Sequence, residues 1–231
     1  LINPTRGEIN VNGRDVVQMN EHELTMFRRT EVAMVFQHYG LLPHRNVLEN
    51  VGFGLKLQGI DIKERNERAR KAINQVGLEG WEHHYPAQLS GGMCQRVGIA
   101  RALVQDSDIL LMDEPFSGLD PLIRREMQDQ LIRLQEDLNK TIIFVTHDLN
   151  EAIRLGDRMV VMREGIFVQE GTPQEIMNNP VDEYVERFVA GEQELHAMKQ
   201  EQHPKYKIRL RSKQYSTGAS NTAPLVAARR R

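Results

Sequence analysis

A short apolar run that ends in two acidic residues constrains the fold of this chain more than any other stretch. Residues 109–112 read Ile-Leu-Leu-Met, and Asp113 and Glu114 follow directly. Such a run predicts a strand buried on both faces, as in the middle of a parallel sheet. At the carboxyl end of such a strand, one carboxylate can hold Mg²⁺ on a nucleotide while its neighbour polarises a water. Taken alone, the pattern also fits a solvated strand end.

A second apolar run predicts a neighbouring strand. Residues 141–146 read Thr-Ile-Ile-Phe-Val-Thr and end at His147, and Pro121 opens the intervening segment, where it suits the first position of a helix. Two buried strands joined by one helix predict a right-handed βαβ unit. We therefore expect His147 to lie beside Glu114 at one edge of the sheet. A lone histidine is usually structural, but this placement favours a functional one.

Further local patterns predict more elements of an α/β fold. Residues 32–36 form another apolar run, which ends at Gln37; a glutamine there is, by itself, most often a satisfied surface amide. Residues 8–13 and 158–169 have the alternation and turn residues of β-hairpins. Residues 47–55 carry apolar positions at helical spacing after Asn46, a suitable helix cap.

Ser90, Gly91 and Gly92 come just before a strong helical pattern. A helix N-terminus binds anions through its unpaired N–H groups and positive dipole end, and glycine lets a phosphate come close. The alternative is an ordinary serine cap, which would not need two glycines.

Composition excludes several classes of protein. The net charge of −2 gives no general reason to expect nucleic acid, and a single cysteine, Cys94, excludes an internal disulfide framework and suits a reducing compartment. No run reaches the roughly 18 apolar residues of a membrane span. His83 and His84 lack the i, i+4 spacing that points two imidazoles the same way on a helix, so a packed loop is favoured over a metal site.

Five features resemble, in order, the motifs of ATP-binding cassette (ABC) ATPases. They are the Q-loop at Gln37, the signature loop at residues 89–92, the Walker B segment ending in Asp113 and Glu114, the D-loop at residues 117–120, and the switch histidine at His147. Each motif alone is modest, but five in this order are specific. The resemblance covers residues 1–188.

The resemblance implies an α/β fold of the ABC-type P-loop NTPases. We expect a partial ATPase domain at residues 1–190, with a mostly parallel core sheet, helices, β-hairpins and a helical signature subdomain at about residues 45–105. The chain contains no G-x-x-x-x-G-K-S/T motif. We therefore expect its first core strand and phosphate-binding loop to lie upstream of Leu1, and the chain as given to bind ATP poorly in its own half-site and to hydrolyse little.

The family's chemistry implies a role for each motif of this half-site. Asp113 would hold Mg²⁺, and Glu114 would act as general base or orient the water that attacks the γ-phosphate of ATP. His147 would donate toward that phosphate, and Gln37 would contact Mg²⁺ or the water. These few groups suffice if a phosphate cradle is also present, because phosphoryl transfer needs mostly positioning and electrostatics.

A second set of residues would serve the opposite half-site. In the family, Ser90, Gly91 and Gly92 contact the ATP held by the opposing subunit, so two copies close head to tail around two ATP molecules. Asp120 would lie at that dimer interface.

Three stretches resemble one branch of the family, which powers import of glycine betaine, proline and related quaternary amines. They are residues 41–50, residues 89–93, with Met93 where many members carry glutamine, and residues 120–129. The resemblance implies a homodimer of nucleotide-binding subunits, a membrane permease docked at residues 41–57 and, indirectly, a solute-binding protein, but no nucleic acid. It places the chain at the cytoplasmic side of the inner membrane, as a peripheral protein.

Residues 191–231 have a different composition. From Lys199 onward there are nine Lys or Arg residues against the single acid Glu201. We expect this tail to be disordered. Contact with anionic lipid beside the permease and a simply solvated terminus are both open.

Two other functions remain open. The chain could be a regulatory or non-hydrolysing half that presents Ser90, Gly91 and Gly92 to a competent partner. It could also be a soluble ABC ATPase of the DNA-repair or translation type, although it has no long coiled-coil insertion and no tandem cassette.

Overall fold

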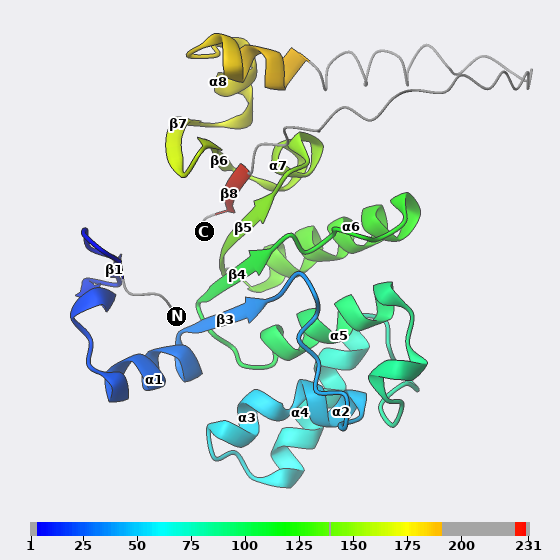
Figure 1. Ribbon diagram of the computed structural model, residues 1–231. Coiled ribbons are helices and arrows are strands. Elements are labelled where there is room, and N and C mark those ends of the chain that lie inside the picture. Colours follow the sequence, from blue (N-terminus) through cyan, green and yellow to red (C-terminus); the bar gives the residue numbers. More distant parts are fainter. Residues whose placement is uncertain (1–3, 139, 191–224, 230–231) are drawn as a thin grey trace, which may run out of the picture. The chain divides into compact units, whose positions relative to one another are not determined.

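The computed structural model describes residues 4–138, 140–190 and 225–229, which form two compact units (Figure 1). The first unit lies within Leu1–Ile142 and the second within Ile143–Arg230. The first contains β1 (Asn10–Val11), β2 (Arg14–Asp15), η1 (Val16–Gln18), α1 (Glu21–Thr30), β3 (Val32–Val35), α2 (Val47–Val51), α3 (Phe53–Leu57), α4 (Ile62–Gln75), η2 (Pro86–Gln88), α5 (Gly91–Leu103), β4 (Ile109–Asp113) and α6 (Pro121–Leu138). After β5 (Thr141–Thr146), the second contains α7 (Leu149–Leu155), β6 (Arg158–Arg163), β7 (Ile166–Gly171), α8 (Pro173–Asn178) and β8 (Leu225–Arg229).

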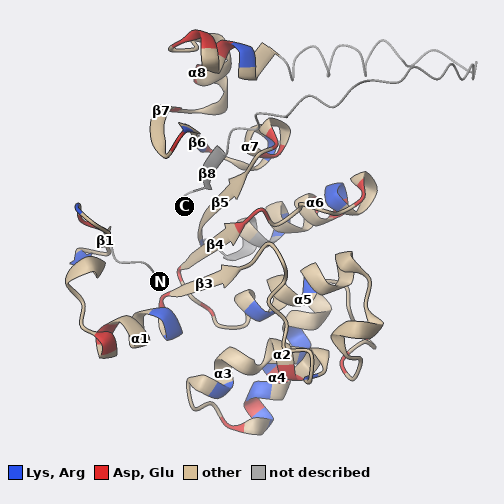
Figure 2. Ribbon diagram, in the orientation of Figure 1, with Lys and Arg blue, Asp and Glu red and all other residues tan. Residues whose placement is uncertain are grey.

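A hairpin and a capped helix open the first unit. β1 pairs with β2 in antiparallel register around Asn12 and Gly13, which adopt positive φ angles of 51° and 79°, so the predicted hairpin is confirmed. In α1, Asn20 and Glu23 form a reciprocal capping box. Figure 2 shows acidic residues at the start of α1 and basic residues at its end, an arrangement that complements the helix dipole.

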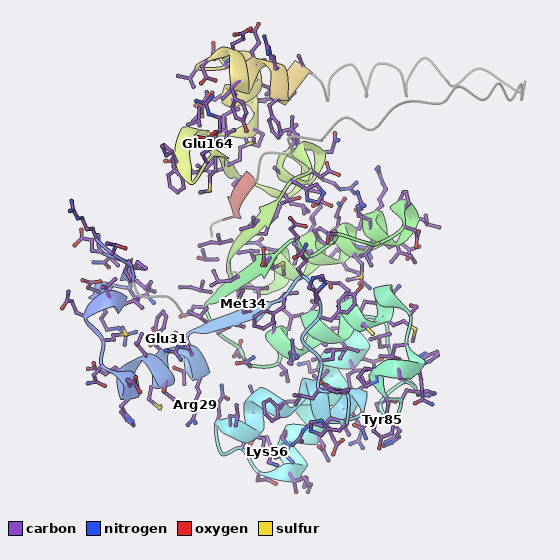
Figure 3. The ribbon with its side chains drawn as sticks, in the orientation of Figure 1. Arg29, Glu31, Met34, Lys56, Tyr85 and Glu164 are labelled. Atoms are coloured by element: carbon purple, nitrogen blue, oxygen red, sulfur yellow. The ribbon has the colours of Figure 1, made fainter. Side chains whose placement is uncertain are left out.

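β3 and β4 form the parallel pair that carries the site. Their register runs from Val32 opposite Ile109 to Val35 opposite Met112. One face of each strand is buried, whereas the other is only partly covered, and Met34 on β3 is 37% exposed (Figure 3). The expectation that residues 109–112 are buried on both faces is therefore wrong for one face: Leu110 and Met112 are buried, whereas Ile109 and Leu111, which point to the opposite side of the strand, are half-buried.

The helices α2, α3, α4 and α5 pack together in the first unit. Their buried side chains include Val47, Val51, Leu55, Ala69, Ile73, Val97 and Ala100. The single helix expected over residues 47–55 is instead two, because α2 ends at Gly52 and α3 begins at the next residue. A Cβ atom at Gly52 would lie 3.1 Å from Cγ of Arg65, so this break brings α4 close to the backbone.

In the second unit, β6 pairs antiparallel with β7 on one side and with β8 on the other. The β6–β7 hairpin turns at Glu164 and Gly165, as predicted, with positive φ angles of 52° and 80°. Strand β8 corrects one expectation for the tail: residues 225–229 pair antiparallel with β6, because the backbone N–H and C=O groups of an extended segment can bond those of a neighbouring strand. The rest of that prediction lies outside the described residues.

Within the described ranges, no helix combines the length and the apolar character needed to cross a bilayer.

Candidate functional site

The structure brings Gln37 and Glu114 together. Gln37 lies two residues beyond β3, and Glu114 lies one residue beyond β4, so the parallel register places both at the same edge. The Nε2 of Gln37 donates to the Oε2 of Glu114 at 2.9 Å, and both side chains are part-buried. Asp113 is the last residue of β4 and directly precedes Glu114 in the sequence, and its side chain is half-buried.

The backbone of Glu114 adopts a conformation that is rare for a residue with a side chain. Its φ angle is +41°, in the left-handed region, which is disfavoured by roughly 1–2 kcal/mol for such residues. The following turn holds it there: the carbonyl of Glu114 accepts from the N–H of Ser117 at 3.2 Å, and the Phe116 side chain is fully buried. A strained carboxylate at a strand end is typical of functional sites.

Asp120 caps the following helix. One oxygen of its carboxylate, Oδ1, accepts from the N–H groups of Leu122 and Ile123, each at 3.1 Å, at the start of α6. Sequence analysis predicted only a place at the dimer interface for Asp120. In the structure its side chain also fixes the first turn of the helix that follows it, α6.

We call Ser90, Gly91 and Gly92 the glycine turn. Ser90 is exposed, and its hydroxyl accepts from the N–H of Met93 at 3.3 Å, so it caps α5. A Cβ atom at Gly91 would lie 3.0 Å from the hydroxyl of Tyr39, and one at Gly92 would lie 2.9 Å from Cγ2 of Ile123. At both glycines an added Cβ atom would therefore make a close contact with a side chain of the same chain, a relationship that the sequence did not reveal.

Sequence reasoning missed Asn50. This residue is fully buried in α2. Its Oδ1 accepts from the N–H of Leu42 at 2.7 Å, and its Nδ2 lies within 3.1 Å of the carbonyl oxygens of Leu42, Arg45 and Asn46. One side chain thus fixes the loop at residues 42–46. The available signal was an asparagine inside an apolar helical pattern, where it is normally unfavourable.

Arg101 of α5 was also missed. Its guanidinium donates to the carbonyl oxygen of Tyr39 at 2.7 Å and to that of Gly40. Burial lowers the pKa of Arg101 from its usual value, yet a guanidinium stays charged in proteins. The segment that follows Gln37 is therefore held on α5 by charge-assisted hydrogen bonds.

His147 lies in the second unit, exposed, directly after β5. The hydroxyl of Thr146 donates to the buried carboxylate of Glu151 at 2.6 Å and accepts from the N–H of Asp148 at 3.1 Å. These bonds fix the turn on both sides of His147. The expected approach of His147 to Glu114, which belongs to the first unit, stays a prediction.

The loop that contains His83 and His84 is packed as the favoured interpretation implies. The ring of His84 lies 4.5 Å from that of Trp81, centroid to centroid, with an interplanar angle of 44°.

Comparison with protein families identifies the family of this chain. The model described as "ABC transporter" matches residues 1–117.

Similar curated proteins include two transport subunits. The chain is 57% identical over 189 residues to the glycine betaine transport ATP-binding protein OpuAA of Bacillus subtilis, covering 82% of this chain and 45% of that protein. It is 54% identical over 191 residues to the glycine betaine/proline betaine transport system ATP-binding protein ProV of Escherichia coli, covering 83% and 48% respectively. The chain thus spans about half the length of these relatives.

A solved structure is similar over most of the chain. It is the dimeric ATP-binding cassette MJ0796 in a post-hydrolysis state, bound to ADP and Pi, with a TM-score of 0.68 and 35% identity. The match covers 74% of this chain and 75% of that one.

Proposed function

Since this chain belongs to the ABC transporter family, we propose that it is an ATP-binding and ATP-hydrolysing subunit of an importer for glycine betaine, proline or related osmoprotectants. The observation that carries the proposal is the hydrogen bond between Gln37 and Glu114 at the ends of two parallel strands. Phosphoryl transfer needs polar groups fixed in this way, because its catalysis depends on positioning and electrostatics. The solute class follows from the transport activity for which the relatives OpuAA and ProV are named.

The oxygen donors at this edge fit Mg²⁺. The ion prefers carboxylate and carbonyl oxygens, which Asp113 and Gln37 supply. Gln37 uses its amide N–H toward Glu114, which leaves its amide oxygen available as a ligand. Bound together with ATP, Mg²⁺ neutralises charge on the phosphate oxygens.

The remaining groups of this half-site act on the attacking water and the phosphate. Glu114 orients the water or accepts its proton, and the donor from Gln37 fixes that carboxylate. His147 donates toward the γ-phosphate as negative charge builds on it. The hydrogen-bonded turn around Thr146 supports this role by fixing the backbone at His147.

The glycine turn serves ATP held by a second subunit. Ser90 and Gly91 are exposed, and they stand at the N-terminus of the 13-residue helix α5, whose first N–H groups have no acceptor within the helix. The exposed Asp120 lies at the same dimer interface, in addition to capping α6. The dimeric state named for the similar cassette supports this arrangement.

A membrane permease subunit is the second partner, docked at residues 41–57. Asn50 gives this segment a fixed shape, and Pro43 and His44 are exposed on it. The chain would then lie at the cytoplasmic side of the inner membrane as a peripheral subunit and would meet the solute-binding protein only through the permease.

The test pairs this chain with the OpuAA subunit. We expect more phosphate release from ATP by the mixture than by both proteins measured separately, because the chain supplies its glycine turn to ATP bound by OpuAA. Ser90→Ala should lower this excess about tenfold or more. Thr30→Ala, which removes an exposed hydroxyl from α1, should leave it unchanged. No excess, together with separate elution of the two proteins in Mg-ATP, would contradict the proposal.

A further inference from the structure

Tyr39 connects the segment after Gln37 to the glycine turn. The hydroxyl of Tyr39 lies 3.0 Å from the place a Cβ atom would take at Gly91, and among the described residues that do not adjoin Gly91 in the helix it is the one side chain within 4 Å of that place. A side chain at position 91 would therefore meet this one hydroxyl. Gly91 and Tyr39 are 52 residues apart in the printed sequence, so the contact depends on the fold.

The backbone of Tyr39 is fixed on the same helix, farther along it. Its carbonyl oxygen accepts from Arg101 at 2.7 Å and lies 3.7 Å from the Cβ place at Gly98. Its φ angle of +61° is followed by +55° at Gly40, and the N–H of Tyr39 donates to the carbonyl of Phe36 at 3.0 Å. Tyr39 thus bridges α5 from its first turn to Arg101.

The other end of this tight segment is Gln37. One residue, His38, separates Gln37 from Tyr39, and Gln37 donates to Glu114. A shift of the Gln37 backbone must therefore displace Tyr39, deform the turn, or break the bonds to Arg101. Charge-assisted bonds to the half-buried guanidinium of Arg101 make the last of these unfavourable.

We propose that Tyr39 is a positioning residue that sets the place of the glycine turn relative to the Gln37–Glu114 pair. The proposal rests on the proposed function, since the glycine turn is taken to serve the nucleotide of a second subunit. Through Tyr39, a change at one half-site reaches the turn that is presented to the other. Gly91 leaves room for the Tyr39 hydroxyl, in addition to any approach of phosphate.

A double-mutant cycle tests the contact without nucleotide. Gly91→Ala should lower the midpoint of urea unfolding, because the new methyl group meets the Tyr39 hydroxyl. In the Tyr39→Phe background that hydroxyl is absent, so the same substitution should lower the midpoint much less. Equal effects of Gly91→Ala in the two backgrounds would overturn the proposal.

Hydrogen exchange tests the positioning itself. Tyr39→Ala should speed exchange of the Met93 and Cys94 amides, which bond Ser90 in the first turn of α5, while residues 62–75 of α4 keep their protection. A uniform increase over both helices would show general destabilisation and would also overturn the proposal. Tyr85→Ala, which removes an exposed tyrosine from the same unit (Figure 3), should change neither helix.

Turnover by the mixture with OpuAA gives the functional readout. Tyr39→Ala should lower kcat by at least about tenfold with little change in KM, because misplacement of a positioned group acts on the chemical step. Tyr39→Phe, which keeps the ring, should lose less. An unchanged kcat for Tyr39→Ala would overturn the proposal. If the unsubstituted chain gives no excess turnover with OpuAA, the proposed function fails. The double-mutant cycle and the hydrogen-exchange experiment use no nucleotide, so they still test whether Tyr39 positions the glycine turn.

Discussion

The side-chain amide of Gln37 donates to the carboxylate of Glu114 at 2.9 Å, across 77 residues of sequence. Each residue follows a strand of the same parallel pair, so the bond depends on the β3–β4 register. This contact gives the first of five predictions.

Gln37→Ala should lower the free energy of unfolding by about 1–2 kcal/mol, because a part-buried carboxylate loses its amide donor. Urea unfolding followed by circular dichroism measures the change. His38→Ala, an exposed neighbour, is the matched control and should have little effect. Equal midpoints for the two variants would show that the bond contributes nothing.

Asn50→Ala should destabilise the chain by about 2–4 kcal/mol, because four backbone groups at residues 42–46 lose their buried partner. Asn50→Asp should be worse, since its carboxylate would face three carbonyl oxygens. The control is Asn74→Ala on the exposed side of α4. A stability loss of similar size at positions 50 and 74, measured by urea unfolding, would contradict this account.

Gly92→Ala should lower the urea midpoint, because its methyl group would lie 2.9 Å from Cγ2 of Ile123. Ile123→Ala removes that atom, so the double variant should lose less stability than the sum of the single variants. Strict additivity of the two changes would show that Ile123 does not restrict position 92.

Cys94 should react slowly with thiol reagents in the folded chain. The side chain is buried, and burial raises the pKa of its thiol. The neutral thiol is favoured by folding, so this contribution to stability is complete below the unfolded pKa and is lost as pH rises through the folded pKa. Absorbance with a disulfide reagent at pH 8 should show slow labelling that becomes fast in urea. Equal rates in both states would contradict burial of the thiol.

The 231-residue chain alone should release little phosphate from ATP, because its sequence contains no G-x-x-x-x-G-K-S/T motif to cradle the phosphates. Phosphate release measured on the purified chain, with Glu114→Gln as control, tests this. Substantial turnover that is lost in Glu114→Gln would show that the chain has a sufficient phosphate site of its own.

Elements specified by local sequence were predictable. The capping box of Asn20 and Glu23, the hairpin turn at Asn12 and Gly13, and the apolar run before Asp113 all act within a few residues. The proximity of Gln37 and Glu114 could also be predicted from the sequence, because each follows an apolar run that predicts a strand, and parallel strands bring their carboxyl ends to one edge of the sheet.

The contacts that shape the site were not predictable. Asn50 and Arg101 bind carbonyl oxygens, which every residue carries, so no residue type at the other end marks the partner. The sequence suggested that Gly91 and Gly92 let a phosphate come close to the backbone. It gave no sign that the side chains of Tyr39 and Ile123 lie next to these two glycines. Such packing depends on the spacing of elements, which composition and periodicity do not encode.

The left-handed backbone at Glu114 affects how substitutions there should be interpreted. Glycine would delete the carboxylate and also relax the torsion, so a stability gain would mix with the loss of the acid. Alanine would keep the torsion but leave Gln37 without its acceptor. Only glutamine keeps the length, the torsion and an oxygen for Gln37, so an experimenter who wants to isolate the role of the negative charge should choose it over the customary alanine scan.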